Sequence, residues 1–317
     1  MLQETVARLS PPVPRGNVLV VTGSPQARAV RAQLRHLRSD HVLVEPEGRN
    51  TAPAIALAAL HLAKRSPEAV MAVLPADHAI GDLAAFRADL TLALDVAART
   101  GALVTFGLVP THPETGYGYI RPGAAVDGAS SRVTWVERFI EKPDRARAEA
   151  LIAEGGVLWN SGIFAWRVAD ILAALRTHLP DVVRRLEGVV GGTRRALTAA
   201  YRALPSISID HGVLEHAPRV AVVRAAFPWS DVGSWAAVEP FWRRTGNGQN
   251  SVRGRAVPID SRGCVVDSPE RLVALVGVED LVVVDTPDAL LVCRKERAQD
   301  VRLVVDELRR RGLGRYL

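Results

Sequence analysis

The chain has 317 residues, of which 48% are hydrophobic, and carries a formal net charge of +6 at pH 7, so it can bury one large core or two modest ones. No apolar run reaches the roughly 18 residues that a membrane helix needs, and the first residues lack the basic and apolar regions of a signal peptide, so we expect a cytoplasmic protein without a membrane partner. Basic residues are scattered among acidic ones with no aromatic platform, which argues against nucleic-acid binding.

Residues 1–245 alternate between short apolar runs and helical patterns. The predicted strands are 18–21, 41–44, 70–74, 102–108, two within 117–140, and 158–166. The predicted helices are 25–37, 51–65 and 83–99, with further helical stretches to about residue 203. This alternation predicts an α/β domain of Rossmann-like type, with a mostly parallel mixed sheet and helices on both faces.

The pattern changes at the turn-rich residues 245–250, which we interpret as a linker. Short β-branched runs follow, punctuated by Pro, Gly or Asp, at 265–266, 272–276, 281–284 and 290–292. An amphipathic helix is expected at 296–311. We therefore predict two domains, 1–245 and 246–317, the second small and β-rich. Cys264 and Cys293 form no metal-like pair and are expected to be core thiols.

Two polar segments follow predicted strands, at the place where α/β proteins bind ligands. Glu45 begins the first, Glu-Pro-Glu-Gly-Arg-Asn-Thr-Ala-Pro-Ala, and Asp77 lies in the second, Leu-Pro-Ala-Asp-His. A carboxylate at Glu45 can accept both N–H donors of the pairing edge of guanine, whereas uracil and thymine suit an amide better. The alternative, a solvated loop glutamate, fits a single Glu better than it fits the whole segment.

Asp77 leaves a predicted buried strand, where a carboxylate is well placed to hold a hard cation such as Mg²⁺. Taken alone, it is equally an ordinary turn residue. Asp231, in Trp-Ser-Asp-Val-Gly-Ser-Trp, supplies a second carboxylate in a turn framed by aromatic residues.

Three further segments carry polar groups suited to a phosphorylated sugar. Residues 115–120, Thr-Gly-Tyr-Gly-Tyr-Ile, place two glycines at a strand start, which indicates a close approach or a bulge. In Phe-Ile-Glu-Lys-Pro, Glu141 can accept from hydroxyl groups, and Lys142, one of only three lysines, can place a charge on a phosphate. The amide of Asn160, in Leu-Trp-Asn-Ser-Gly, can both donate and accept.

Together and in this order, these segments resemble the sugar-phosphate nucleotidylyltransferases, and among them the mannose-1-phosphate guanylyltransferases. The residues implied to bind the nucleotide are Glu45, Arg49, Asn50, Thr51 and Asp77, and Thr51 is also a plausible N-cap. The residues implied to bind the sugar phosphate are Tyr117, Gly118, Glu141, Lys142 and Asn160. The resemblance implies catalytic roles for Lys142 and Asp77, and a Mg²⁺ ion held by Asp77 and Asp231.

The implied reaction joins GTP and α-D-mannose 1-phosphate into GDP-mannose with release of pyrophosphate, and a homodimer is left open as the assembly. The segment at 207–216 departs from the family pattern twice: His211 stands where Tyr is usual, and His216 where Lys is usual. Neither histidine has metal-ligand spacing, so we expect a structural role for both. The alternatives are a nucleotidylyltransferase for another sugar 1-phosphate and nucleotide pair, and a non-catalytic nucleotide-sugar-binding or regulatory homologue.

One family feature is missing from residues 1–317, a Gly-rich loop of the Gly-Gly-x-Gly-Thr-Arg-Leu type. The N–H groups of such a loop grip the triphosphate. We therefore expect a start codon assigned too far downstream, and no GDP-mannose formation by residues 1–317 alone. The sequence also lacks the sugar-isomerase domain of some relatives, so a single activity is expected.

Overall fold

The computed structural model describes residues 1–245 and 249–316. They form two compact units, the first made of Met1–Ala76 and Asp82–Trp229, the second of Asp77–Gly81 and Ser230–Leu317. The first is an α/β unit with a central sheet and the second is β-rich, which confirms the predicted fold class. The predicted boundary between residues 245 and 246 stays a prediction, and residues 246–248 of the predicted linker lie outside the described residues.

The first unit begins with a small α/β layer. Its elements are α1 Leu2–Arg8, β1 Val20–Gly23, α2 Ala27–Gln33, β2 Val42–Glu45 and α3 Thr51–Ala63. β1 and β2 pair in parallel, with Val20 opposite Val42 and Gly23 opposite Glu45. The polar residues that follow the two strands therefore emerge at the same end of this sheet. The alanine-rich α3 is largely buried, because small side chains let it pack closely on its neighbours.

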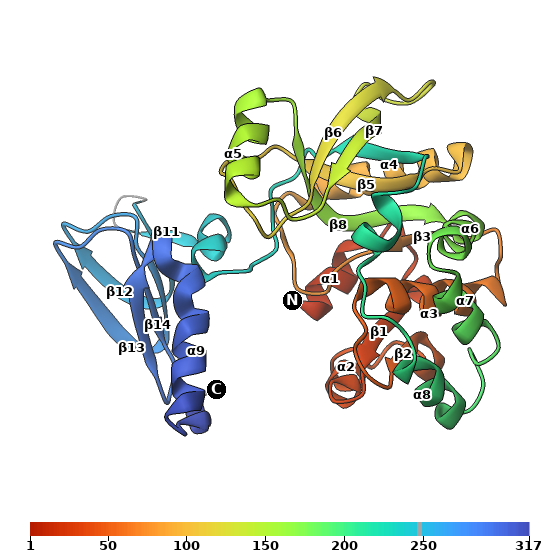
Figure 1. Cartoon of the computed structure of the whole chain (residues 1–317). Helices are drawn as coiled ribbons and strands as arrows, with labels where there is room; N and C mark the ends of the chain where they lie inside the picture. Colours follow the sequence, from red (N-terminus) through yellow and green to blue (C-terminus); the bar gives the residue numbers. More distant parts are fainter. Residues whose placement is uncertain (246–248, 317) are drawn as a thin grey trace. The chain divides into compact units, whose positions relative to one another are not determined.

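Within the described residues, a six-stranded sheet forms the centre of the first unit (Figure 1). In spatial order its strands are β3 Val70–Val73, β8 Leu158–Arg167, β5 Leu103–Leu108, β9 Val220–Arg224, β7 Val133–Ile140 and β6 Tyr119–Ala125. β3, β5, β6 and β9 run in one direction, and β7 and β8 run in the other. The sheet is thus mixed. The prediction that this sheet is mostly parallel is wrong, because β7 and β8 lie between strands of the opposite direction and, among the described neighbours in the sheet, β5 and β9 alone pair in parallel.

Helices pack on this sheet and on one another. They are α4 Leu83–Thr100, α5 Arg145–Glu154, α6 Val168–His178, α7 Pro180–Glu187 and α8 Arg194–Arg202. α4 begins at Asp82, whose carboxylate accepts hydrogen bonds from the N–H groups of Ala84 at 2.9 Å and Ala85 at 3.0 Å. It ends at Gly101, whose φ of 69° is a left-handed conformation that glycine adopts without strain. Between these caps, Phe86 is completely buried.

The second unit contains a sheet ordered β11 Arg243–Thr245, β12 Asn250–Ile259, β13 Val265–Val276, β14 Leu281–Asp285 and β15 Leu290–Arg294. Two short strands, β4 Ala79–Ile80 and β10 Trp229–Ser230, pair with each other. The prediction of separate strands at 265–266 and 272–276 is wrong, because both runs belong to β13. The predicted terminal helix is a 3₁₀ segment, Lys295–Asp300, followed by α9 Val301–Arg310.

Across the described ranges, no helix is both long and apolar enough to traverse a bilayer. Both cysteines are free thiols. Cys264 is completely buried, as expected of a core thiol, whereas Cys293 is only half-buried. Burial raises the pKa of both thiols above the ordinary value.

Candidate functional site

Glu45 ends β2 and is only 9% exposed. Its carbonyl accepts hydrogen bonds from the main-chain N–H and the hydroxyl of Ser24, both at 3.2 Å. Among the described residues, neither Oε1 of Glu45 nor the buried hydroxyl of Tyr201 has a hydrogen-bond partner of good geometry. Burial raises the pKa of Glu45, and the nearby Tyr201 hydroxyl lowers it. Glu45 therefore has a buried acceptor oxygen without a well-placed donor, and its contact with guanine stays a prediction.

The loop after Glu45 is held by contacts within the loop and by hydrogen bonds from Arg49 to the carbonyl of Arg202 and from Ile207 to the carbonyl of Arg49. The guanidinium of Arg49 lies 2.7 Å from Oε1 of Glu47. Asn50 has a φ of 66°, and its Oδ1 accepts from the N–H of Thr51 at 2.8 Å, so Asn50 is the N-cap of α3. The predicted Thr51 cap is therefore wrong by one residue, because asparagine tolerates the left-handed conformation required here. The nucleotide contacts of these residues stay predictions.

Tyr117 and Gly118 lie immediately before β6. The Tyr117 ring packs edge-on against Trp159 and Trp229, with ring centroids 5.2 and 5.3 Å apart. A Cβ atom at Gly118 would lie 2.7 Å from Oε2 of Glu141, so a larger residue meets the carboxylate. Gly118 therefore lies at a close approach between the main chain and the side chain of Glu141, a residue of the proposed sugar site.

Glu141 and Lys142 follow the end of β7. Nζ of Lys142 lies 3.5 Å from Oε1 of Glu141, and the lysine side chain is 60% exposed whereas the glutamate side chain is 15% exposed. Burial, and next the charge of Asp210, raise the pKa of Glu141, while Lys142 lowers it. Lys142 has a φ of 44°, a left-handed conformation that is unfavourable for residues other than glycine. An exposed cation thus stands beside a half-buried carboxylate.

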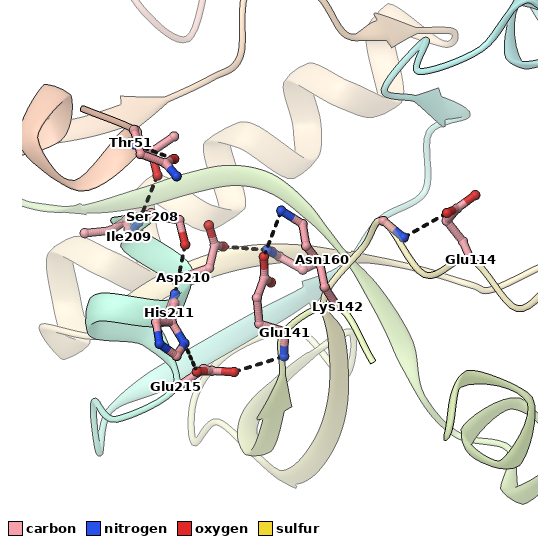
Figure 2. A network of polar contacts seen from close by, with 12 residues as sticks. Thr51, Glu114, Glu141, Lys142, Asn160, Ser208, Ile209, Asp210, His211 and Glu215 are labelled. Carbon is pink, nitrogen blue, oxygen red and sulfur yellow. Dashed lines mark hydrogen bonds and ion pairs between the residues drawn. The ribbon is translucent and has the colours of Figure 1, made fainter. Parts of the chain in front are cut away.

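Asn160 lies in β8 and is 8% exposed. Its Oδ1 accepts from the hydroxyl of Thr105 at 2.7 Å. Its Nδ2 donates to Oδ1 of Asp210, also at 2.7 Å (Figure 2). Burial raises the pKa of Asp210, whereas the Asn160 hydrogen bond and the charge of Lys142 lower it. These two contacts, together with the N–H of Gly162 at 3.4 Å from Oδ1, fix the orientation of the amide; its contact with a sugar hydroxyl stays a prediction.

Glu215 completes the network from the end of a π-helical turn, Asp210–Leu214. Its Oε1 accepts from the main-chain N–H of Glu141 at 3.0 Å, and its Oε2 lies 2.8 Å from Nδ1 of His211. The main-chain N–H of His211 donates to the hydroxyl of Ser208 at 3.2 Å. π-helical turns occur frequently at functional sites.

Figure 2 shows Glu141, Lys142, Asn160, Asp210 and Glu215 as neighbours, although they come from three separate segments of the chain. The sequence predicted the first three as site residues and missed the two acidic ones. Their only signal was a position within 207–216, the segment that resembles a family motif. The contact between Glu215 and Glu141 spans 74 residues, and a single sequence carries no sign of such a contact.

The two predicted metal ligands both belong to the second unit. Asp77 lies two residues before β4, and Asp231 directly follows β10, the strand that pairs with β4. Oδ1 of Asp231 accepts from the N–H of Gly233 at 3.0 Å. Two carboxylates match the oxygen ligands that Mg²⁺ takes alongside phosphates and water. No cluster of three or more His, Cys, Asp or Glu in the described part of the chain is arranged to hold a metal, so the Mg²⁺ site stays a prediction.

Comparison with known proteins defines the class. Residues 1–243 match the family model of nucleotidyl transferases, and residues 254–308 match that of the MannoseP isomerase/GMP-like beta-helix domain. The chain therefore belongs to the nucleotidyl transferase family, as the resemblance of its motifs implies.

The chain is also similar to individual proteins of known name. The chain is 40% identical over 324 residues to mannose-1-phosphate guanylyltransferase from Escherichia coli, covering 100% of this chain and 68% of the relative. It is also 40% identical over 320 residues to the xanthan biosynthesis protein XanB from Xanthomonas campestris, covering 98% of this chain and 67% of that protein. The crystal structure of mannose-1-phosphate geranyltransferase from Thermus thermophilus has a TM-score of 0.86 and 39% identity, covering 97% of this chain and 89% of that one.

Proposed function

We propose that this protein transfers a guanylyl group from GTP to α-D-mannose 1-phosphate, giving GDP-mannose and pyrophosphate. The observation that carries the proposal is the 40% identity to a mannose-1-phosphate guanylyltransferase along the whole chain. The geometry supports it, since an exposed lysine, an oriented amide and partly buried carboxylates meet at one place in the first unit. Neither the fold nor the comparisons favour a non-catalytic homologue.

The bonds that change join phosphorus and oxygen. A phosphate oxygen of the sugar phosphate attacks the α-phosphorus of GTP in line, and the bond to the departing pyrophosphate breaks. A phosphate monoester has a second pKa near 6 and is mostly dianionic at pH 7, so the attack needs no strong base and no protein nucleophile. The protein therefore acts by positioning the substrates and neutralising their charge.

The residues divide this work. Glu45 accepts the two N–H groups of guanine, assisted by contacts from the Arg49–Thr51 loop. Lys142 neutralises the sugar phosphate, and its 60% exposed side chain is free to reach a ligand. Glu141 and Asn160 bind sugar hydroxyls. Mg²⁺, held when bound by Asp77 and Asp231, supplies charge neutralisation at the phosphates.

The test combines the protein and Mg²⁺ with GTP, UTP or dTTP and with mannose 1-phosphate or glucose 1-phosphate. Anion-exchange chromatography identifies the nucleotide sugar, and a coupled assay follows pyrophosphate. From the chain with a Gly-rich phosphate loop restored before residue 1, we expect GDP-mannose as the main product, and a strong loss of it in Lys142→Ala; residues 1–317 alone are expected to form none. Preferred use of UTP, dTTP or glucose 1-phosphate would indicate a nucleotidylyltransferase for another pair. Binding of GDP-mannose without turnover would indicate a non-catalytic homologue.

We also propose that the protein works in the cytoplasm without a nucleic-acid or membrane partner. A homodimer is the assembly to test, by analytical ultracentrifugation of the free protein and of the protein with GDP-mannose.

A further inference from the structure

We propose that Glu215 is a positioning residue for Lys142: its carboxylate holds the main chain at Glu141 and Lys142 in the conformation that presents the lysine. The inference rests on the proposed function in one respect, the assignment of Lys142 to the sugar phosphate.

The conformation of Lys142 is one that the local sequence disfavours. Its φ of 44° lies in the left-handed region, which L-residues other than glycine avoid. Pro143 follows directly, and a residue before proline normally adopts an extended conformation. Such a backbone persists only where the surroundings impose it, and it is common where a side chain must be held for function.

The carboxylate of Glu215 contacts this backbone directly. β7 ends at Ile140, so the N–H of Glu141 is the first main-chain donor beyond that strand. Oε1 of Glu215 accepts it at 3.0 Å. Hydrogen bonds from main-chain N–H groups to a carboxylate are stronger than neutral ones. The bond therefore fixes the Ile140–Glu141 peptide, which enters the residue that precedes the left-handed Lys142.

Glu215 is itself held in place. Its Oε2 lies 2.8 Å from Nδ1 of His211, and its side chain is 19% exposed. The π-helical turn Asp210–Leu214 thus supports the site at both ends, with Asp210 orienting the amide of Asn160 and Glu215, which follows the turn, holding the Ile140–Glu141 peptide. This gives His211, which departs from the family pattern, a specific part in the support.

The charge at position 215 argues against a role in stability alone. Burial is the main cause that raises the pKa of Glu141 and of Asp210, and the charge of Glu215 adds a smaller upward contribution to both, so its placement here opposes the ionisation of two neighbours. Lys142 and His211 face the same cluster from its other sides. A neutral side chain would support the fold without this repulsion, whereas a carboxylate gives the strongest hold on the peptide N–H.

The first experiment compares Glu215→Ala and Glu215→Gln in steady-state kinetics. Loss of a charge-assisted hydrogen bond predicts a roughly 10- to 100-fold lower kcat/KM for mannose 1-phosphate in Glu215→Ala, with KM for GTP nearly unchanged. Glu215→Gln keeps an acceptor oxygen without the charge and should recover part of the loss. Asp82→Ala is the matched control, since it removes a carboxylate that holds main-chain N–H groups elsewhere in the unit; it should lower the melting temperature and leave kcat/KM unchanged.

The second experiment is a double-mutant cycle with Lys142→Ala. If Glu215 acts through Lys142, Glu215→Ala should cause little further loss in the Lys142→Ala background. Equal losses in both backgrounds would overturn the inference.

The third experiment measures hydrogen exchange at the Glu141 amide by NMR in the wild type and in Glu215→Ala. We expect faster exchange in the variant, and unchanged exchange would also overturn the inference. This measurement needs no turnover. If the chain with a Gly-rich phosphate loop restored forms no GDP-mannose, the proposed function fails, while the exchange rates still decide whether Glu215 holds this peptide.

Discussion

Replacing Glu45 with glutamine should weaken the preference for GTP over UTP and dTTP by roughly 30- to 150-fold. A carboxylate accepts both N–H groups of guanine, whereas glutamine offers one acceptor oxygen and turns an NH₂ group toward the second donor. The loss of this charged two-point contact is on the order of 2–3 kcal/mol, at about 1.4 kcal/mol per factor of ten.

The same substitution should change how stability depends on pH. Burial raises the pKa of Glu45 in the folded protein above its ordinary value of 4.5. The folded state therefore holds this proton more tightly than the unfolded state does, and stability falls as pH rises from the unfolded pKa through the raised folded pKa. Glutamine does not titrate, so we expect Glu45→Gln to melt at or above the wild-type temperature at pH 7, with the difference shrinking below about pH 4.

The assay measures kcat/KM for GTP, UTP and dTTP, and melting temperatures of the free protein from pH 4 to 8. Glu68→Gln is the control, since that carboxylate is exposed and belongs to the same unit; it should alter neither measurement. Unchanged nucleotide ratios in Glu45→Gln would remove Glu45 from the base pocket. A clearly lower melting temperature at pH 7 would refute the reasoning from burial.

Three further predictions address the metal, the sugar site and the core. Asp77→Asn and Asp231→Asn should each raise the Mg²⁺ concentration for half-maximal turnover and preserve the circular dichroism spectrum; near-normal turnover at low Mg²⁺ would exclude that residue as a ligand. Gly118→Ala should raise KM for mannose 1-phosphate, because the new Cβ lies 2.7 Å from Oε2 of Glu141; an unchanged KM would show that this carboxylate moves freely. Phe86→Ala should lower the free energy of unfolding by about 3–5 kcal/mol, since the ring is completely buried; urea denaturation giving a loss below about 1 kcal/mol would contradict this.

Apolar periodicity predicts the elements of the first unit well, because each strand or helix there buries a continuous set of apolar residues. The strand predicted at 158–166, for example, is β8, Leu158–Arg167. The direction of neighbouring strands escapes this reasoning, because a buried run looks the same whether its partner is parallel or antiparallel.

In the second unit, Pro269 misleads the local pattern by suggesting the end of a strand. β13 continues past it because its partner β12 shifts register between Gly254 and Arg255. Gly254 has a φ of 101°, and a Cβ there would lie 1.9 Å from the carbonyl oxygen of Ser268. Only glycine allows this irregularity, which lets a strand accommodate a proline.

In the candidate site, too, the local sequence predicts some features, whereas others depend on contacts with distant parts of the chain. Glu45 and Lys142 could be proposed as site residues from the sequence because distinctive polar residues follow predicted strands. The cap at Asn50 was misplaced to Thr51 because both residue types cap helices, and only the left-handed backbone decides between them. Glu215 could not be identified, because its role depends on a contact with a peptide 74 residues away.

One set of contacts bears on how the two substrates influence each other. The carbonyl of Arg49 accepts from the N–H of Ile207 at 3.3 Å, and the hydroxyl of Thr51 accepts from the N–H of Ile209 at 2.8 Å. These two hydrogen bonds join the loop proposed to hold the nucleotide to the segment that leads into Asp210. A ligand that orders one segment also orders the other, so each substrate should bind more tightly after its partner, by the same factor in either order of addition.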